Sequence, residues 1–186
     1  MNTHDTPRHT VLGLAAVALF LALFVPGAFA ESAPIDELQK LMKTSAAEMM
    51  EGKPDTMLAH TLPSVLTLLG GEEKAKEILT KGLQSMASTL ELMGYKIKSY
   101  TAGEPEKTRT EGDTTFVLLP TTMIAEGEEG KVTEKSYVLG IWKAGPDAKW
   151  YLLRLAMPEE RVRQVVPELP KDFTWPARQA PVVEKR

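Results

Sequence analysis

Three polar side chains, those of His60, Tyr137 and Arg154, are the strongest candidates for chemistry in this sequence. A histidine near the mouth of a pocket titrates close to neutral pH and can act as a general base. A tyrosine whose ring lies among apolar groups can donate a hydrogen bond to a carbonyl group of a ligand. Arg154 lies between Leu153 and Leu155 in an apolar strand pattern, so its charge needs either a carboxylate of this chain or the anionic end of a ligand. A reaction that used these groups would need at least two of them in one cavity.

Each candidate also has a structural interpretation. His60 can cap the end of a helix or pack its ring at the surface, and Arg154 can reach solvent at the rim of the sheet. Strand aromatics such as Tyr137 and Trp142 are often ordinary core or dimer-interface residues. Because side chains alternate along a strand, Tyr137 and Trp142 are predicted to lie on opposite faces of the sheet.

The composition excludes several kinds of site. The chain has no cysteine and three histidines, and two of these, His4 and His9, lie within the first thirty residues. Thiol nucleophiles, thiolate metal sites and iron–sulfur clusters are therefore excluded, and we predict no metal and no cofactor. The net charge is −3 with both signs mixed along the chain, whereas a nucleic-acid partner requires a clustered basic surface. We therefore predict no nucleic-acid partner.

Residues 1–30 have the pattern of a secretory signal peptide. Arg8 precedes an uncharged apolar run at 11–25, and Ala-Phe-Ala at 28–30 places small residues on both sides of a large one, as at a cleavage site. The run is shorter than the ~20 apolar residues that a membrane-spanning helix needs. The sequence predicts cleavage after Ala30, a periplasmic or secreted protein, and no stable membrane insertion after cleavage.

From residue 31 onward the chain has the length of one domain and begins with helices. Apolar residues recur at helical spacing, which predicts helices at 35–51, 55–62 and 72–93. The longest of these has one apolar stripe that includes Met86, Leu90 and Met93. Methionine side chains adapt their shape, so they suit either a deformable core or the lining of a pocket for an apolar ligand.

The period of the pattern changes from helical to alternating at Tyr95. Alternation predicts strands at 95–102, 108–125, 132–143 and 149–157, and the second of these has a possible division at 111–113. The short connections between them allow hairpins but no crossover helices, so the sheet is predicted to be mostly antiparallel. Pro120 lies inside the second strand pattern, which predicts a bulge or an edge position there. A short helix to about residue 166 and a Pro-rich tail at 167–186 follow. We expect Phe173 and Trp175 to pack on the body and residues 177–186 to be loose.

Four short segments of this chain resemble the NTF2-like superfamily, which is also called SnoaL-like or ketosteroid-isomerase-like. Gly-Lys-Pro-Asp at 52–55 resembles its turn between the first two helices, and residues 60–65 resemble its segment after the second helix. Gly-Gly-Glu-Glu at 70–73 resembles the start of its third helix, and Trp-Tyr-Leu-Leu at 150–153 resembles its closing strand. The resemblance covers roughly residues 35–157, and the order and spacing of the segments carry it.

The resemblance implies an α+β fold shaped as a cone, in which N-terminal helices pack on a curved, mostly antiparallel sheet. It assigns residues 31–166 to the domain and leaves 167–186 as a tail outside the usual pattern. The long helix would cross the concave face of the sheet and leave an apolar pocket. Members of the superfamily often form homodimers through the outer face of the sheet, so a homodimer is implied here. The superfamily contains enzymes and binding proteins, so the fold alone does not decide the function.

Two functions remain open at this point. The first is an exported, non-catalytic module that binds a small apolar molecule or a protein partner, because the chain offers no clear acid–base set. The second is a pocket enzyme of isomerase, dehydratase or hydrolase type that uses acid and base side chains without a metal. Five residues are the expected contacts of a ligand: Tyr137, Trp142, Arg154, Met86 and Leu90.

Overall fold

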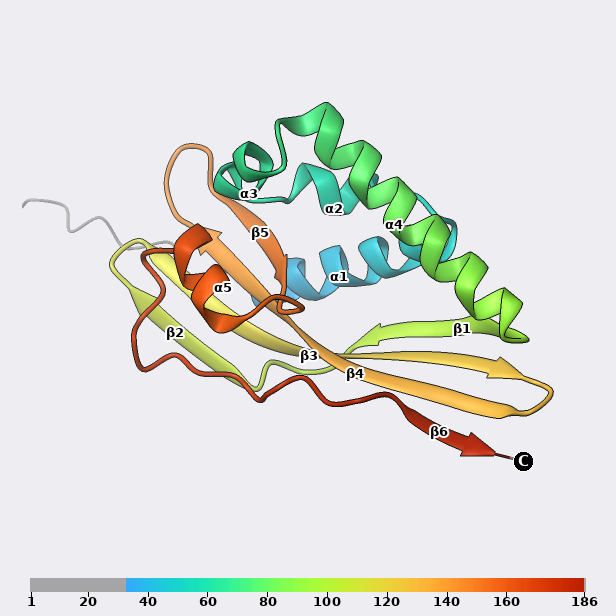
Figure 1. The fold of residues 1–186 in the computed structure, drawn as a ribbon. Coiled ribbons are helices and arrows are strands. Elements are labelled where there is room, and N and C mark those ends of the chain that lie inside the picture. Colours follow the sequence, from blue (N-terminus) through green and yellow to red (C-terminus); the bar gives the residue numbers. More distant parts are fainter. Residues whose placement is uncertain (1–32, 186) are drawn as a thin grey trace, which may run out of the picture.

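The computed structural model describes residues 33–185, and the predicted signal peptide lies outside this range. The described part is an α+β protein with five helices and one six-stranded sheet in which every strand pair is antiparallel (Figure 1). The predicted fold class is therefore confirmed. Between residues 33 and 185, no helix has both the length and the apolar character needed to cross a membrane.

Four helices precede the sheet, and glycines set their ends. The helices are α1 (Ile35–Met50), α2 (Asp55–Ala59), α3 (Pro63–Leu68) and α4 (Glu72–Leu92). Gly52 and Gly94 follow α1 and α4 with φ of 72° and 77°, a left-handed conformation that glycine adopts without strain. The sequence predicted α1 and α4 to within one residue at each end. It extended α2 to residue 62, three residues beyond its observed end, and it predicted no helix for the apolar stretch that forms α3.

A long hairpin runs through the middle of the sheet, and shorter strands flank it. The strands are β1 (Tyr95–Ala102), β2 (Lys107–Glu111), β3 (Thr114–Gly127), β4 (Gly130–Lys143), β5 (Lys149–Arg154) and β6 (Val182–Lys185). β1 and β2 pair with successive halves of β3, while β6 and β5 pair with successive halves of β4. The division at 111–113 that the sequence allowed is present as the turn between β2 and β3.

Pro120 lies inside β3, where the sequence predicted a bulge or an edge position. It lies opposite the break between β1 and β2: Ala102 pairs with Thr121, and Lys107 pairs with Leu118. Across the break, the Gly103 amide donates to the Pro120 carbonyl oxygen at 2.8 Å. Proline has no amide proton to donate to a neighbouring strand. No donor is needed from Pro120, because neither β1 nor β2 pairs with it.

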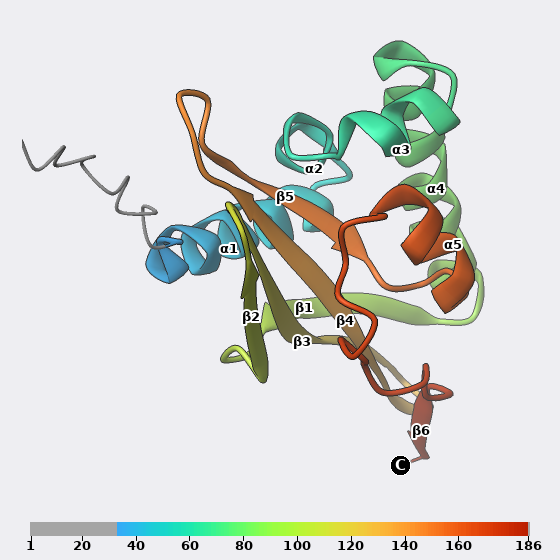
Figure 2. The same cartoon turned by 90° about the vertical axis from the view of Figure 1, so that its left-hand side faces the viewer.

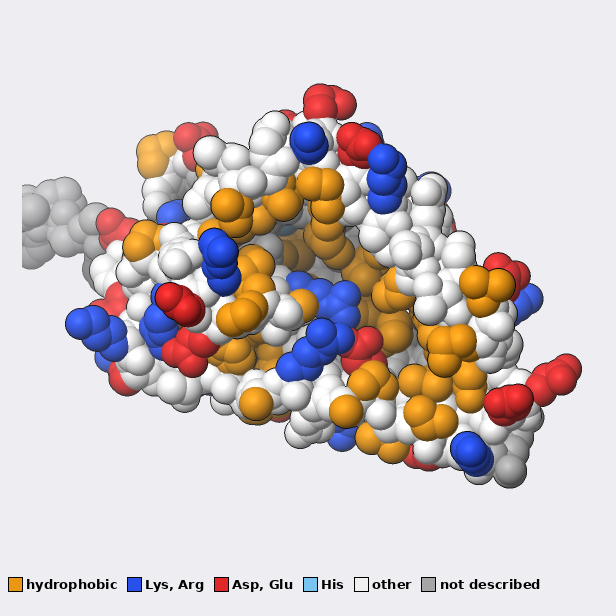
Figure 3. Space-filling view, viewed as in Figure 1, with side chains coloured by type: hydrophobic (Ala, Val, Ile, Leu, Met, Phe, Trp, Pro, Cys, Tyr) orange, Lys and Arg blue, Asp and Glu red, His pale blue; other side chains and the backbone are white. Residues whose placement is uncertain are grey.

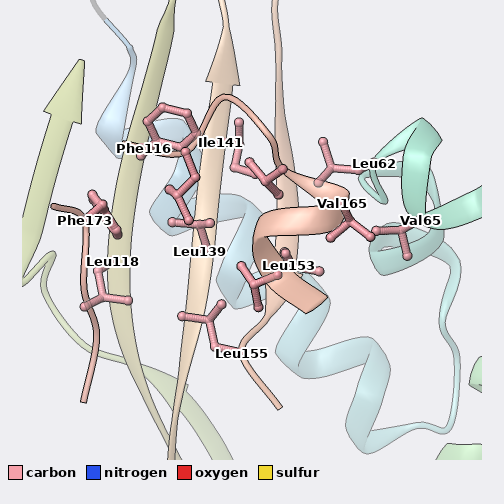
Figure 4. Close-up of a cluster of buried hydrophobic side chains, with 13 residues drawn as sticks. Leu62, Val65, Phe116, Leu118, Leu139, Ile141, Leu153, Leu155, Val165 and Phe173 are labelled. Carbon is pink, nitrogen blue, oxygen red and sulfur yellow. The ribbon is translucent and has the colours of Figure 1, made fainter. Parts of the chain in front are cut away.

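The outer face of the sheet is covered by α5 (Glu159–Val165) and the segment after it. Figure 4 shows the buried cluster there, to which Phe116 and Leu139 of the sheet and Val165 of α5 contribute. Phe173 is 1% exposed, and Trp175 packs against the same cluster, as predicted. The face through which a homodimer was implied thus carries a helix of the same chain.

The expectation that residues 177–186 are loose is wrong for β6. This strand pairs with Gly130–Thr133 of β4, and a Cβ atom on Gly130 would collide with the backbone of Glu184. All four side chains of β6 are exposed, so no alternation of buried and exposed positions marks the strand in the sequence. Backbone pairing with a distant strand holds it in place instead.

The inner face of the sheet is covered unevenly by α1 and α4 (Figures 1 and 2). α1 contributes Leu38 and Met42 to a second buried cluster, which contains Val138, Trp142 and Trp150 of the sheet. α4 lies over the other end of the face and has Ala75 as the one buried residue among its 21. Most of the apolar stripe of α4 is therefore left without close packing against the sheet.

Candidate functional site

A cleft lies between α4 and the inner face of the sheet. Figure 3 shows the hollow beneath α4, walled by hydrophobic side chains, with basic and acidic side chains at its edge. It has two parts, which follow each other along α4: an inner cavity of about 330 Å³ and an outer groove of about 700 Å³. Both volumes fall in the range of about 300–1,000 Å³ that is usual for small-molecule sites.

The inner cavity is enclosed by α1, α2, α3, α4 and β5. Ile78 and Leu79 of α4 form one wall, and Leu152 and Arg154 of β5 form the opposite wall. Four flexible thioether side chains complete much of the lining: Met42, Met49, Met57 and Met157. These methionines suit the pocket interpretation that the sequence left open, because their side chains can adjust to an apolar ligand.

The outer groove lies beneath the C-terminal half of α4. Met86 and Leu90 come from the helix and Met93 directly follows it, while Met123, Val132 and Glu134 come from β3 and β4. Pro181 and Val183 of the C-terminal segment also line it. The tail that lay outside the predicted domain therefore builds part of the groove.

One charged cluster, formed by Arg154, Glu134 and Arg178, lies where the two parts of the cleft meet. Glu134 accepts from Arg154 Nη2 at 3.4 Å and from Arg178 Nη2 at 3.2 Å, both through Oε1. The Glu134 side chain is 12% exposed, that of Arg154 is 33% exposed and that of Arg178 is 59% exposed. Arg154 Nε is buried and has no hydrogen-bond partner among the described residues.

His60 has a structural position. It directly follows α2, and its Nδ1 lies 2.7 Å from the carbonyl oxygen of Trp150, to which it donates. The Leu152 amide in turn donates to the His60 carbonyl oxygen at 2.7 Å. These two bonds tie the end of α2 to β5, and His60 lines neither part of the cleft.

The structure does not bring His60, Tyr137 and Arg154 into one cavity. Tyr137 packs against the outer-face cluster with Leu139, whereas Arg154 opens into the cleft on the inner face. Burial, and next the negative charge of Glu106, raise the pKa of Tyr137 above its ordinary value. Strand alternation explains the separation, because the pairing of Val138 with Arg154 puts them together on the face opposite Tyr137.

Of the five expected ligand contacts, three line the cleft and two lie elsewhere in the sheet. Met86 and Leu90 line the outer groove, and Arg154 lines the inner cavity. Trp142 lies on the inner face, opposite to Tyr137 as predicted, but it is 5% exposed beneath α1 with its ring centroid 5.4 Å from that of Trp150. Tyr137 and Trp142 therefore lie away from the cleft.

Sequence reasoning missed Glu134 and Arg178 as site residues. One local signal existed for Glu134: it follows Val132 at a spacing of two, so alternation places this charge on the inner face with apolar neighbours. No local signal existed for Arg178, which reaches Glu134 only because the C-terminal segment returns to β4. Across residues 33–185, no group of three or more His, Cys, Asp or Glu side chains is placed to hold a metal ion.

Comparisons of the chain with protein-family models, with curated proteins and with solved structures find no match. The class of protein is therefore defined by the geometry of the chain itself. It is an α+β protein in which a curled antiparallel sheet carries helices over its inner face and encloses an apolar cleft with one charged cluster.

Proposed function

We propose that this protein is an exported, non-catalytic module of NTF2-like fold that binds a small apolar molecule in the cleft beneath α4. The NTF2-like assignment is supported by the resemblance of four sequence segments and by a curled sheet with helices over its inner face. Export is supported by the signal-peptide pattern of residues 1–30. A small apolar ligand is the occupant that the cleft favours over a catalytic substrate.

The proposal rests on how little of the apolar surface of α4 is buried. This helix has an apolar stripe, yet it buries Ala75 alone, and Ile78 and Met93 are 43% and 58% exposed. Exposed apolar surface is costly in water, and a stripe that faces a hollow of ligand size is relieved when a ligand fills it. The walls on both sides are almost entirely apolar, which matches an apolar occupant.

The enzyme alternative has weaker support. It needed at least two of His60, Tyr137 and Arg154 in one cavity, and these residues lie apart. His60 is engaged by backbone groups, and Tyr137 lies on the other face of the sheet. Among the three, Arg154 alone lines the cleft, and an arginine is always protonated and cannot act as a general base.

Binding can be tested with Nile red, an uncharged apolar dye whose fluorescence rises in an apolar site. We expect the purified protein to bind the dye and to unfold at a higher temperature in its presence. Ile78→Asp places a carboxylate in the wall of the inner cavity and should weaken binding at least about tenfold, because an apolar ligand cannot compensate a desolvated charge. Leu92→Asp is the matched control, since Leu92 is 90% exposed on the same helix and should leave binding unchanged.

Two results would contradict the proposal. One is the absence of any fluorescence change or thermal shift with Nile red. The other is equal loss of binding in Ile78→Asp and Leu92→Asp, which would show that the dye binds elsewhere.

The export part of the proposal has its own test. Mass spectrometry of the protein recovered from bacterial cells that produce the full chain should give a mass that begins at Glu31, and cell fractionation should place it outside the cytoplasm. An intact N-terminus in the cytoplasmic fraction would overturn the export proposal and leave the binding proposal untouched.

A further inference from the structure

We infer that the ligand is a single-chain amphiphile with one anionic head group, which places its head on Arg154 and its chain in the inner cavity. This inference rests on the proposed function, because it specifies the chemistry of the molecule that fills the cleft. Three features of the cleft carry it: the charge balance of its cluster, the free donor of Arg154 and the shape of the apolar lining.

The charged cluster carries an excess of one positive charge. Arg154 and Arg178 share a single carboxylate, that of Glu134, and both contacts go to the same oxygen atom. Arg154 and Glu134 are the only charged residues among the described residues that line the inner cavity and the outer groove. Arg178 is 59% exposed and is solvated, whereas Arg154 is 33% exposed and lies beside the apolar lining, so a further negative charge next to Arg154 is the complement of this cluster.

Arg154 also has hydrogen-bonding capacity that the chain does not use. A guanidinium has five N–H donors, and the bond from Nη2 to Glu134, at 3.4 Å, is long for a charged pair. Its Nε is buried without a partner among the described residues. Carboxylate and phosphate groups bind arginine through two parallel N–H donors, so an anionic head group of this kind can bind the exposed part of the Arg154 guanidinium, although Nε itself has no exposed surface in this conformation.

The lining of the inner cavity fits a flexible apolar chain. In the inner cavity α4 contributes Ile78 and Leu79, whereas Met86 and Leu90 line the outer groove beyond the charged cluster. Arg154 lies on the wall of the inner cavity, whose other lining residues are mostly methionine and aliphatic, with Ser45, Thr61 and Tyr100 among them. An alkyl chain can pack among the four methionine side chains of this cavity while its head remains on Arg154.

The experiment compares three probes that share a twelve-carbon chain and differ in the charge of the head group: dodecanoate, dodecanol and dodecyltrimethylammonium. Each is used to displace Nile red from the purified protein at pH 8 and low ionic strength. We expect dodecanoate to displace the dye at a concentration about tenfold below that of dodecanol, as a charge-assisted hydrogen bond predicts, and the cation to be weakest. Added salt should narrow the difference.

Substitutions in the cluster should act in opposite directions. Arg154→Gln should bring dodecanoate to the level of dodecanol and leave dodecanol unchanged, since only the anion uses the guanidinium. Glu134→Gln should tighten dodecanoate several-fold, because it removes the carboxylate that competes for both arginines. Arg161→Gln is the matched control: Arg161 is exposed on α5 and bonds Gln164, so its removal should change no probe.

The outcomes separate this inference from the proposed function. Equal displacement by dodecanoate and dodecanol, or an equal loss of both in Arg154→Gln, would overturn the anionic head group and leave apolar binding standing. Failure of Nile red and all three probes to bind would overturn both. Binding of the protein to phosphatidylglycerol vesicles in preference to free dodecanoate would assign the cleft to a membrane lipid. A dimer that Ile78→Asp dissociates would assign the cleft to a second copy of this chain. Either result would overturn the inference.

Discussion

Helices α1 and α4 lie over the same face of the same sheet, and both carry an apolar stripe, but only α1 is packed. α1 buries five residues in 16, among them Leu38 and Met42, whereas α4 buries one in 21. The difference cannot come from helical periodicity, which is similar in the two. It comes from the surface that each helix meets.

Beneath α1 the sheet offers a glycine where a close approach is needed. A Cβ atom on Gly140 would lie 2.8 Å from Leu38 Cδ2 and 3.4 Å from the ring of Trp150, so the missing side chain is what lets Leu38 become fully buried. Beneath α4 the sheet presents Met123, Val132 and Glu134 instead. Glu134 is held by Arg154 and Arg178 and offers the helix no apolar packing surface, and a hollow lies beneath α4 there. An apolar stripe therefore predicts a helix, but the partner surface decides whether it forms core or a binding site.

The largest expected effect separates the two helices directly. Leu38→Ala should lower the free energy of unfolding by about 2–5 kcal/mol, because it leaves a cavity in a packed cluster. Leu90→Ala, on the half-buried stripe of α4, should lower it by less than about 1 kcal/mol. Urea unfolding followed by circular dichroism measures both, and comparable losses would show that α4 is packed as tightly as α1.

A smaller effect is expected when the close approach of α1 is blocked. Gly140→Ala puts a methyl group against Leu38 and should cost about 1 kcal/mol or more, since the methyl groups of this fully buried side chain would have to shift within a packed cluster. The same unfolding measurement applies. A neutral or stabilising result would mean that α1 moves aside without loss, which would remove the explanation given for its tight packing.

The matching substitution in α4 should act in the opposite direction. Gly82 lies inside the helix, and a Cβ atom there would meet nothing within 4 Å. Gly82→Ala should therefore stabilise the protein by about 0.5–1 kcal/mol through helix propensity alone. A loss of stability would indicate a clash and thus a filled groove beneath this turn.

The smallest effect tests the outer face and appears only at high pH. Burial and the charge of Glu106 raise the pKa of Tyr137 in the folded protein, so its contribution to stability is complete below the ordinary tyrosine pKa of about 10 and is lost as the pH rises through the folded value. Tyr137→Phe should therefore lose less stability than the wild type in that range. Parallel pH dependences of the two proteins above pH 10 would show that Tyr137 is freely solvated.

Much of the framework could be predicted from local pattern. The change of period at Tyr95 placed the helices before the sheet, and alternation placed Tyr137 and Trp142 on opposite faces, as the structure confirms. Pro120 was expected at an irregular position, and it lies opposite the break between β1 and β2. These features depend on residues close together in the chain, so a single segment contains the information.

The candidate site could be predicted only in part. Met86, Leu90 and Arg154 were expected ligand contacts and line the cleft, whereas Tyr137 and Trp142 lie in packed clusters away from it. Trp142 shares the inner face, but α1 covers it. The sequence identified the face of each strand and could not identify which helix would cover each part of that face.

The sequence by itself determined where α1, α4 and the strands from β1 to β5 lie, which side chains share a face, and that cysteine chemistry is excluded, because these follow from residue type and from spacings of two to four residues. The tertiary structure alone decided that α1 is packed and α4 stands over a hollow, that Arg178 reaches Glu134 across 44 positions, and that the C-terminal segment returns as β6. Those outcomes depend on the fit between surfaces that are distant in the chain, and no local spacing encodes that fit.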